Sequence, residues 1–125
     1  LAIVGVTGGF TYNICPPRQW KAKITQTDID DPVVDAVFKN TYGEVFTTNY
    51  ESTGFIKILN AGSLFATTKT QVYFGTSNLN TVGGASFMNK GNIDPSYIEI
   101  FAFDQFIGLN DNQIKSLDIT IETYL

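Results

Sequence analysis

Two-residue alternation of apolar and polar side chains is the feature that most constrains the fold of this chain. Every second residue from Trp20 to Ile24 is apolar, and the residues between them are lysines. The same pattern recurs from Leu117 to Ile121. Successive side chains of a β-strand point to opposite faces, so the pattern predicts strands with one buried and one solvated face. Strands of this kind are typical of antiparallel sheets.

Further strand candidates lie between these two, each bounded by turn-forming residues. They are residues 33–38, 44–50, 55–59, 70–75, 81–88 and 97–103. Residues 45–59 are predicted to form one hairpin, because Gly54 lies in a turn between two of the candidates. Residues 97–103 are apolar on both faces, so we expect this strand to be central in its sheet. Gly83 and Gly84 suggest a bulge in the weaker candidate 81–88.

No helical periodicity extends over three turns, which leaves room only for a short helical turn at 64–68 or 110–115. We therefore predict an all-β domain, an antiparallel β-sandwich of jelly-roll-like type with about eight strands.

The first seventeen residues differ from the rest. Glycines alternate with apolar residues there, and Pro16 and Pro17 then form a stiff spacer. Because such a segment cannot bury its apolar residues alone, we expect 1–17 to be an N-terminal arm or edge strand that docks on a partner, and 18–125 to be a single β-sandwich domain. An ordinary first strand of the same sheet is the alternative. The residues expected to make the arm's assembly contacts are Leu1, Ile3, Val4, Val6 and Phe10.

The low charge and the many aromatic residues limit which kinds of partner the chain can have. Only 16% of the residues are charged, against about 25% in typical domains, whereas 14% are aromatic. The net charge is −4 and no basic stripe is present, so neither a nucleic acid nor an anionic membrane is an expected partner. No run approaches the ~18 apolar residues of a membrane span. The low charge suggests that a partner covers some apolar surface.

The chain contains no histidine, which excludes the commonest catalytic sites. Ser-His-Asp and Cys-His arrangements and the common catalytic zinc sites all require it. The glycine-rich phosphate-binding and nucleophile-elbow motifs are also absent. We therefore expect no catalytic residues, no cofactor and a non-enzymatic function.

Carboxylate-pair chemistry is the one reaction class left open. Glycosidases hold two carboxyl groups about 5–10 Å apart. Glu99 is the strongest candidate, because it lies among aromatic residues in the segment 97–103. The alternative is that Glu99 faces solvent or pairs with a lysine across the strands.

Weaker candidates are an acidic loop, a group of aromatic residues and the single cysteine. Asp28, Asp30 and Asp31 offer oxygen ligands to Ca²⁺, but their spacing does not match a calcium-binding loop, and a solvated turn explains them as well. The loop 110–112 has the same two interpretations. Cys15 fits either a small buried hydrophobe or an interchain disulfide. The aromatic residues that fit either a sugar-stacking platform or the core are Trp20, Tyr42, Tyr50 and Tyr73.

Three blocks of the chain, 24–45, 59–78 and 108–125, carry turn and strand signatures shared with other proteins. The matching residues are Thr25-Gln26, Pro32-Val33, Asn40-Thr41-Tyr42-Gly43, Gly62, Phe65, Lys69-Thr70 and Phe74-Gly75. In these blocks the chain resembles small uncharacterised proteins of Bacteroidota phages, especially flavobacterial ones. The third block departs from the family: it has extra residues before the last strand and lacks the usual arginine and terminal proline.

The resemblance covers residues 19–125 and implies a viral setting, but it assigns no catalytic residue. Small β-domains of phages are most often virion components, so we expect a virion structural protein, a capsid decoration, spike or fibre subunit. Its expected partners are further copies of itself, with a trimer favoured, and other virion proteins. The alternatives are a glycan- or receptor-binding module of a phage spike and a small carboxylate-based hydrolase.

Overall fold

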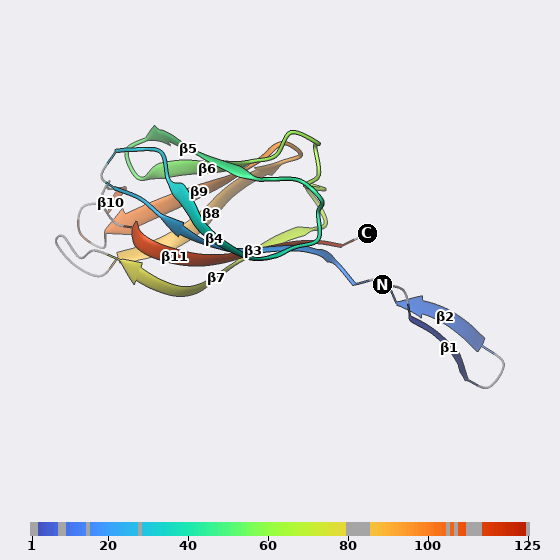
Figure 1. The fold of residues 1–125 in the computed structure, drawn as a ribbon. Coiled ribbons are helices and arrows are strands. Elements are labelled where there is room, and N and C mark those ends of the chain that lie inside the picture. The colour runs from blue at the N-terminus through green and yellow to red at the C-terminus, as the bar shows by residue number, and fades with distance from the viewer. Residues whose placement is uncertain are drawn as a thin grey trace.

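The computed structural model describes residues 3–7, 10–14, 16–27, 29–79, 86–104, 106, 108–109 and 114–124. Over these residues the chain is all-β and contains no helix. Nine of the described strands form two antiparallel sheets that pack face to face (Figure 1). The predicted antiparallel β-sandwich is therefore confirmed.

The four-stranded sheet is built around the first and last strands of the sandwich. Its strands, in order across the sheet, are β4 (Val33–Asn40), β3 (Arg18–Thr25), β11 (Ile114–Thr123) and β7 (Thr70–Leu79). The two segments with the clearest alternation are thus neighbours, and Trp20 lies opposite Ile121. The apolar residues of the two alternating segments face the other sheet and are buried: Trp20, Ala22, Ile24, Leu117, Ile119 and Ile121.

The five-stranded sheet is the second layer. Its strands are β5 (Thr47–Ser52), β6 (Phe55–Leu59), β9 (Tyr97–Asp104), β8 (Ser86–Asp94) and the short β10 (Gly108–Leu109). β5 and β6 form the predicted hairpin. β9 lies between β6 and β8, which confirms the expected central position. The short β10 pairs with the end of β9, on the same side of β9 as β6.

Aromatic side chains fill one part of the core between the sheets. Trp20 lies against Phe46 with ring centroids 5.2 Å apart, and Phe46 contacts both Tyr42 and Phe65. Isoleucines of β6 and β9 extend this core along the second sheet. Burying each such side chain stabilises the fold by about 1.5–3 kcal/mol.

Several predicted boundaries differ from the structure. The strand predicted at 44–50 begins only at Thr47, because the preceding segment turns at Gly43, which has a φ of 84°, and places Tyr42 and Phe46 in the core. Residues 64–68 are irregular rather than helical, and Lys115 lies in β11. Gly83 and Gly84, as well as residues 110–113, lie outside the described residues.

The N-terminal segment forms a separate hairpin. β1 (Ile3–Thr7) pairs with β2 (Phe10–Ile14), and within the described residues neither strand belongs to a sheet of the sandwich. Figure 1 shows the hairpin beyond the end of the sandwich at which β3 begins. Of the candidate arm residues, Ile3, Val4 and Val6 lie in β1 and Phe10 in β2. Leu1 and Cys15 lie outside the described residues.

Candidate assembly surface

The two outer faces of the sandwich differ sharply in chemistry. On the four-stranded sheet, the outward residues of β3 and β11 are polar, and Lys23 lies opposite Asp118. Gln19 donates a side-chain hydrogen bond to Glu122, which also accepts one from the Tyr124 hydroxyl at 2.9 Å. This bond raises the pKa of Tyr124 to about 12. The centre of this face, over β3 and β11, is therefore polar.

The outer face of the five-stranded sheet is aromatic. Along β9, alternate residues from Ile98 to Asp104 are buried in the core, so Phe101 and Phe103 are on the outward side. Phe55 of β6 lies opposite Phe101, and Phe87 of β8 lies opposite Phe103. We call these four residues, Phe55, Phe87, Phe101 and Phe103, the phenylalanine cluster.

The rings of the phenylalanine cluster form one continuous series of contacts. Phe55 and Phe101 have centroids 4.8 Å apart, Phe101 and Phe103 6.3 Å, and Phe87 stacks on Phe103 at 5.2 Å. Three of the rings are half-buried by one another, whereas Phe87 is 49% exposed. The exposed Leu109 extends the apolar surface, since it pairs with Phe103.

Gly91 of β8 allows the Phe101 ring to lie low over the sheet. A Cβ atom at this position would be 2.3 Å from Cε2 of Phe101 and 2.8 Å from a carboxylate oxygen of Glu99. The ring therefore covers the backbone of the neighbouring strand.

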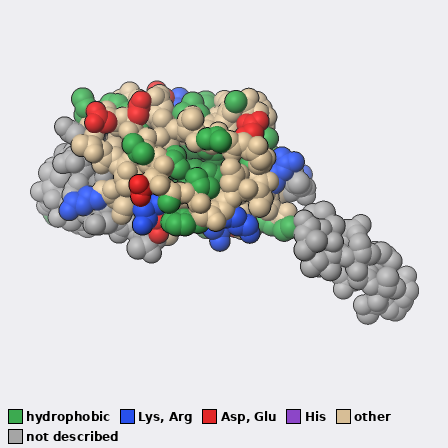
Figure 2. Space-filling model, in the orientation of Figure 1, with side chains coloured by type: hydrophobic (Ala, Val, Ile, Leu, Met, Phe, Trp, Pro, Cys, Tyr) green, Lys and Arg blue, Asp and Glu red, His purple; other side chains and the backbone are tan. Residues whose placement is uncertain are grey.

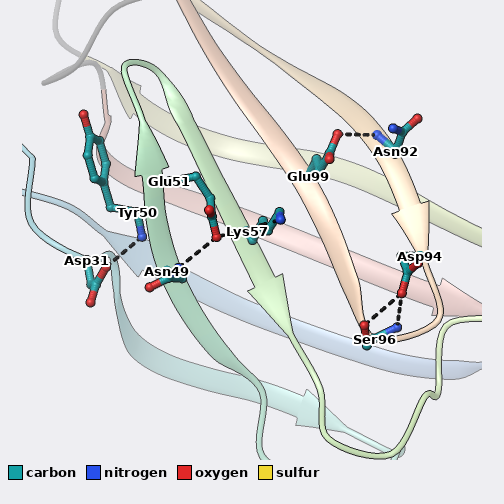
Figure 3. Close-up of polar contacts among 9 residues, drawn as sticks. All are labelled: Asp31, Asn49, Tyr50, Glu51, Lys57, Asn92, Asp94, Ser96 and Glu99. Atoms are coloured by element: carbon teal, nitrogen blue, oxygen red, sulfur yellow. Dashed lines mark hydrogen bonds and ion pairs between the residues drawn. The ribbon is translucent and has the colours of Figure 1, made fainter.

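Charged residues beside the phenylalanine cluster are partnered within the face (Figure 3). The Lys57 ammonium lies 4.2 Å from the centroid of the Tyr97 ring and 3.9 Å from Oε1 of Glu51. Glu99 lies opposite Lys57 and accepts a hydrogen bond from the Asn92 backbone N–H at 3.1 Å. Glu99 thus has the position of a cross-strand partner of a lysine, as its non-catalytic interpretation predicts.

The Asp94 carboxylate stabilises the turn between β8 and β9. Oδ1 of Asp94 accepts hydrogen bonds from the backbone N–H and the hydroxyl of Ser96, at 3.0 and 2.8 Å (Figure 3). These bonds lower the pKa of Asp94. The carboxylate has a structural task in the turn that connects two strands of the aromatic face.

The acidic loop has a similar structural task. Oδ1 of Asp31 accepts a hydrogen bond from the backbone N–H of Tyr50 at 2.7 Å, on the outer edge of β5 (Figure 3). The backbone N–H of Asp30 donates to Thr27, whereas Asp28 lies outside the described residues. In the part of the chain that the structure describes, no three histidine, cysteine or acidic residues come together to hold a metal ion.

The four aromatic residues considered for sugar stacking do not form a platform. Trp20 and Tyr42 are buried in the core, which corrects that interpretation for both. Tyr50 packs against the core, and Tyr73 is exposed on β7. The aromatic surface of the molecule is made instead by phenylalanines, which alternation did not distinguish because both faces of β9 are apolar.

A second apolar region borders β4. Val33, Val37, Phe38 and Val45 are all more than half exposed. Figure 2 shows hydrophobic side chains in the middle of the face that β4, residues 41–46 and β5 surround. We call the four exposed residues Val33, Val37, Phe38 and Val45 the open edge. The pairing of β4 with β3 has two register shifts. Two charged residues of β4, Asp35 and Lys39, are also exposed.

The sequence matches no family model, and no curated protein or solved structure matches the chain. No helix in the described part of the chain is long and apolar enough to cross a membrane.

Proposed function

We propose that this chain is a virion structural subunit that acts by assembling with copies of itself and catalyses no reaction. The observation that carries the proposal is the contrast between the two outer faces: one is polar, and the other carries a continuous series of phenylalanine rings. Contiguous apolar surface of this kind marks interaction sites.

The chemistry of the aromatic face favours a protein partner. Phenylalanine has no hydrogen-bonding group, and the neighbouring Lys57 is already engaged by Tyr97 and Glu51. Such a surface gains free energy mainly by burial against another apolar surface. The hairpin of β1 and β2 supplies a second reason, because a two-stranded hairpin is at best marginally stable by itself in water.

The virion setting rests on the resemblance of residues 19–125 to phage proteins. Mass spectrometry of purified particles, with the copy number of the chain, tests this part. A chain that is missing from the particles, although it is made in the infected cell, would refute it.

Self-assembly is tested with the full chain by light scattering after size-exclusion chromatography and by native mass spectrometry. We expect a homo-oligomer, with a ring of three subunits as the state to be tested. Deletion of residues 1–17 should yield a monomer, with the circular dichroism of the sandwich retained, because both large sheets are formed without the hairpin. A full chain that remains monomeric at high micromolar concentration would refute self-assembly.

A glycan- or receptor-binding function is the second candidate, favoured by the half-buried Tyr97 and Phe101 rings on the outward side of β9. The Lys57 ammonium covers the Tyr97 ring on which a sugar would stack, which weighs against it. A glycan array probed with the full chain and with a Phe101→Ala variant tests it. Binding that Phe101→Ala abolishes, by a chain that does not self-assemble, would replace the first proposal.

A further inference from the structure

We infer that the phenylalanine cluster is the docking surface for the β1–β2 hairpin of a second copy of this chain. The inference rests on the proposed self-assembly and names the two surfaces that meet: β1 (Ile3–Thr7) and β2 (Phe10–Ile14) of one subunit, and Phe55, Phe87, Phe101 and Phe103 of the next.

The two surfaces match in charge. Residues 1–17 contain no lysine, arginine, aspartate or glutamate. The phenylalanine cluster likewise contains only uncharged rings. Lys57, which lies beside the cluster, already contacts Glu51 and the Tyr97 ring. Burying the hairpin on this surface would therefore leave no charge without a partner, which is the main cost that such an interface must avoid.

The backbone of the hairpin also suits packing on the outer face of a sheet. The backbone N–H and C=O groups on the facing edges of β1 and β2 pair with each other. The hairpin is therefore a small two-stranded sheet and does not need to add to the edge of another sheet as a single strand would. Two sheets pack face to face at about 10 Å when flat apolar faces meet. The Phe101 ring lies low over Gly91, so at this point of the face a second sheet could approach closely.

The position of the hairpin requires a second copy. Figure 1 shows the hairpin at the end of the sandwich where β3 begins, and β10, which pairs with Phe103, at the opposite end. A subunit therefore cannot cover its own phenylalanine cluster with its own hairpin in this arrangement. Contacts between unlike ends of identical subunits close into rings or continue as filaments.

The open edge is the competing docking surface. Its exposed valines and Phe38 are interspersed with Asp35 and Lys39, and the two register shifts in β4 distort the edge against the addition of a flat strand. The uncharged hairpin would leave those two charged groups without partners. The phenylalanine cluster is the better match.

Photo-crosslinking of the full chain tests the inference directly. A benzophenone amino acid replaces Tyr12 in β2, and equal amounts of ¹⁴N- and ¹⁵N-labelled protein are mixed, irradiated and analysed as peptides. We expect mixed-isotope crosslinks to residues 55–59 and 97–104. Crosslinks that go mainly to residues 33–45, or only within one chain, would overturn the inference.

Two charge insertions complete the test. Phe101→Lys and Phe103→Lys together should raise the dissociation constant of the oligomer roughly 30-fold or more, since residues at the centre of an interface contribute at that level. The matched control is Tyr73→Lys, an outward aromatic residue on the polar sheet, which should leave assembly unchanged. Thermal melts of the monomeric forms show whether each variant is folded.

The outcomes separate the inference from the proposed function. Loss of the oligomer on deletion of residues 1–17, together with normal assembly of the Phe101→Lys/Phe103→Lys variant, would refute the docking surface and leave self-assembly standing. A full chain without any oligomer would refute both.

Discussion

The hydroxyl groups of Tyr42 and Thr123 lie 2.8 Å apart in the core, although 81 residues separate them in the chain. The Thr123 hydroxyl lies equally close to that of Thr70. The three buried hydroxyls thus satisfy one another where the segment after β4, the start of β7 and the end of β11 meet. This small polar group fixes the relative positions of three distant parts of the sequence.

Tyr42→Phe removes one of these three hydroxyl groups and its hydrogen bond to Thr123. We expect the substitution to lower the free energy of unfolding by about 1 kcal/mol. Thr123 retains Thr70 as a partner, which keeps the loss moderate. Urea denaturation at neutral pH measures the difference. An unchanged midpoint would mean that the Tyr42 hydroxyl contributes nothing to stability.

The same residue predicts a dependence of stability on alkaline pH. Burial raises the pKa of Tyr42 in the folded state above its ordinary value of 10.0. The associated stability is complete below pH 10 and is lost as the pH rises through the folded-state pKa. Denaturation at a series of pH values should show a steeper alkaline decline for the wild type than for Tyr42→Phe. Tyr124→Phe separates the contribution of Tyr124, whose pKa of about 12 falls in the same range.

Asn60 is predicted to be a critical polar residue of the fold. Its buried side chain accepts hydrogen bonds from the backbone N–H groups of Gly62 and Leu64 and donates one to the Pro95 carbonyl. Asn60→Ala should cost about 2–4 kcal/mol, because it removes three hydrogen bonds to the backbone, each of which contributes about 1 kcal/mol. Asn60→Asp should keep the two accepted bonds and lose the donated one. A loss below about 1 kcal/mol in Asn60→Ala, measured by urea denaturation, would contradict this assignment.

Gly91→Ala tests the packing of the aromatic face. The added methyl group would meet the Phe101 ring and Glu99, so the ring must move, and we expect a loss of about 1–3 kcal/mol. Gly75→Ala in β7 is the matched control, because its Cβ would make only ordinary contacts of 3.4 Å with Asp118. Thermal unfolding compares the two. Equal melting temperatures would contradict the low position of the Phe101 ring.

Asp31→Ala should expose the outer edge of β5. The carboxylate accepts a hydrogen bond from the Tyr50 backbone N–H, and its removal takes away a side chain that covers this edge of the sheet, where another chain can add. We expect a stability loss of about 1 kcal/mol and a higher rate of aggregation on heating, followed by light scattering. Asp31→Asn keeps an acceptor oxygen and should behave nearly as the wild type. Aggregation of Asp31→Asn at the rate of Asp31→Ala would contradict the role of this hydrogen bond.

Strand existence was predictable from the sequence wherever one face of a strand is polar. Alternation from Trp20 to Ile24 and from Leu117 to Ile121 marked the buried residues correctly, since each strand separates core from solvent. That these two strands pair with each other was not predictable, because nothing in either segment indicates its neighbour. The Phe55–Leu59 strand and its hairpin followed from the turn at Gly54.

The aromatic surface could not be found by the same reasoning. In β9 the core residues and the outward phenylalanines are all apolar, so alternation carries no information about which side faces solvent. Only the register with Phe55 and Phe87 shows that the rings gather on one face. The task of Asp31 was equally hidden, because the Tyr50 backbone N–H that it accepts from lies 19 residues away in the sequence. The same holds for the bond from Asn60 to the Pro95 carbonyl, 35 residues away, whereas its bonds to Gly62 and Leu64 are local.

The order of the strands also determines when the protein can fold. β11 is the last strand along the chain, and it occupies the middle of its sheet, between β3 and β7. During synthesis, therefore, the edges of this sheet emerge from the ribosome long before the strand that joins them. Contacts between such distant segments form slowly, and a nascent chain that lacks β11 would expose the apolar side of β3 to other chains and to chaperones.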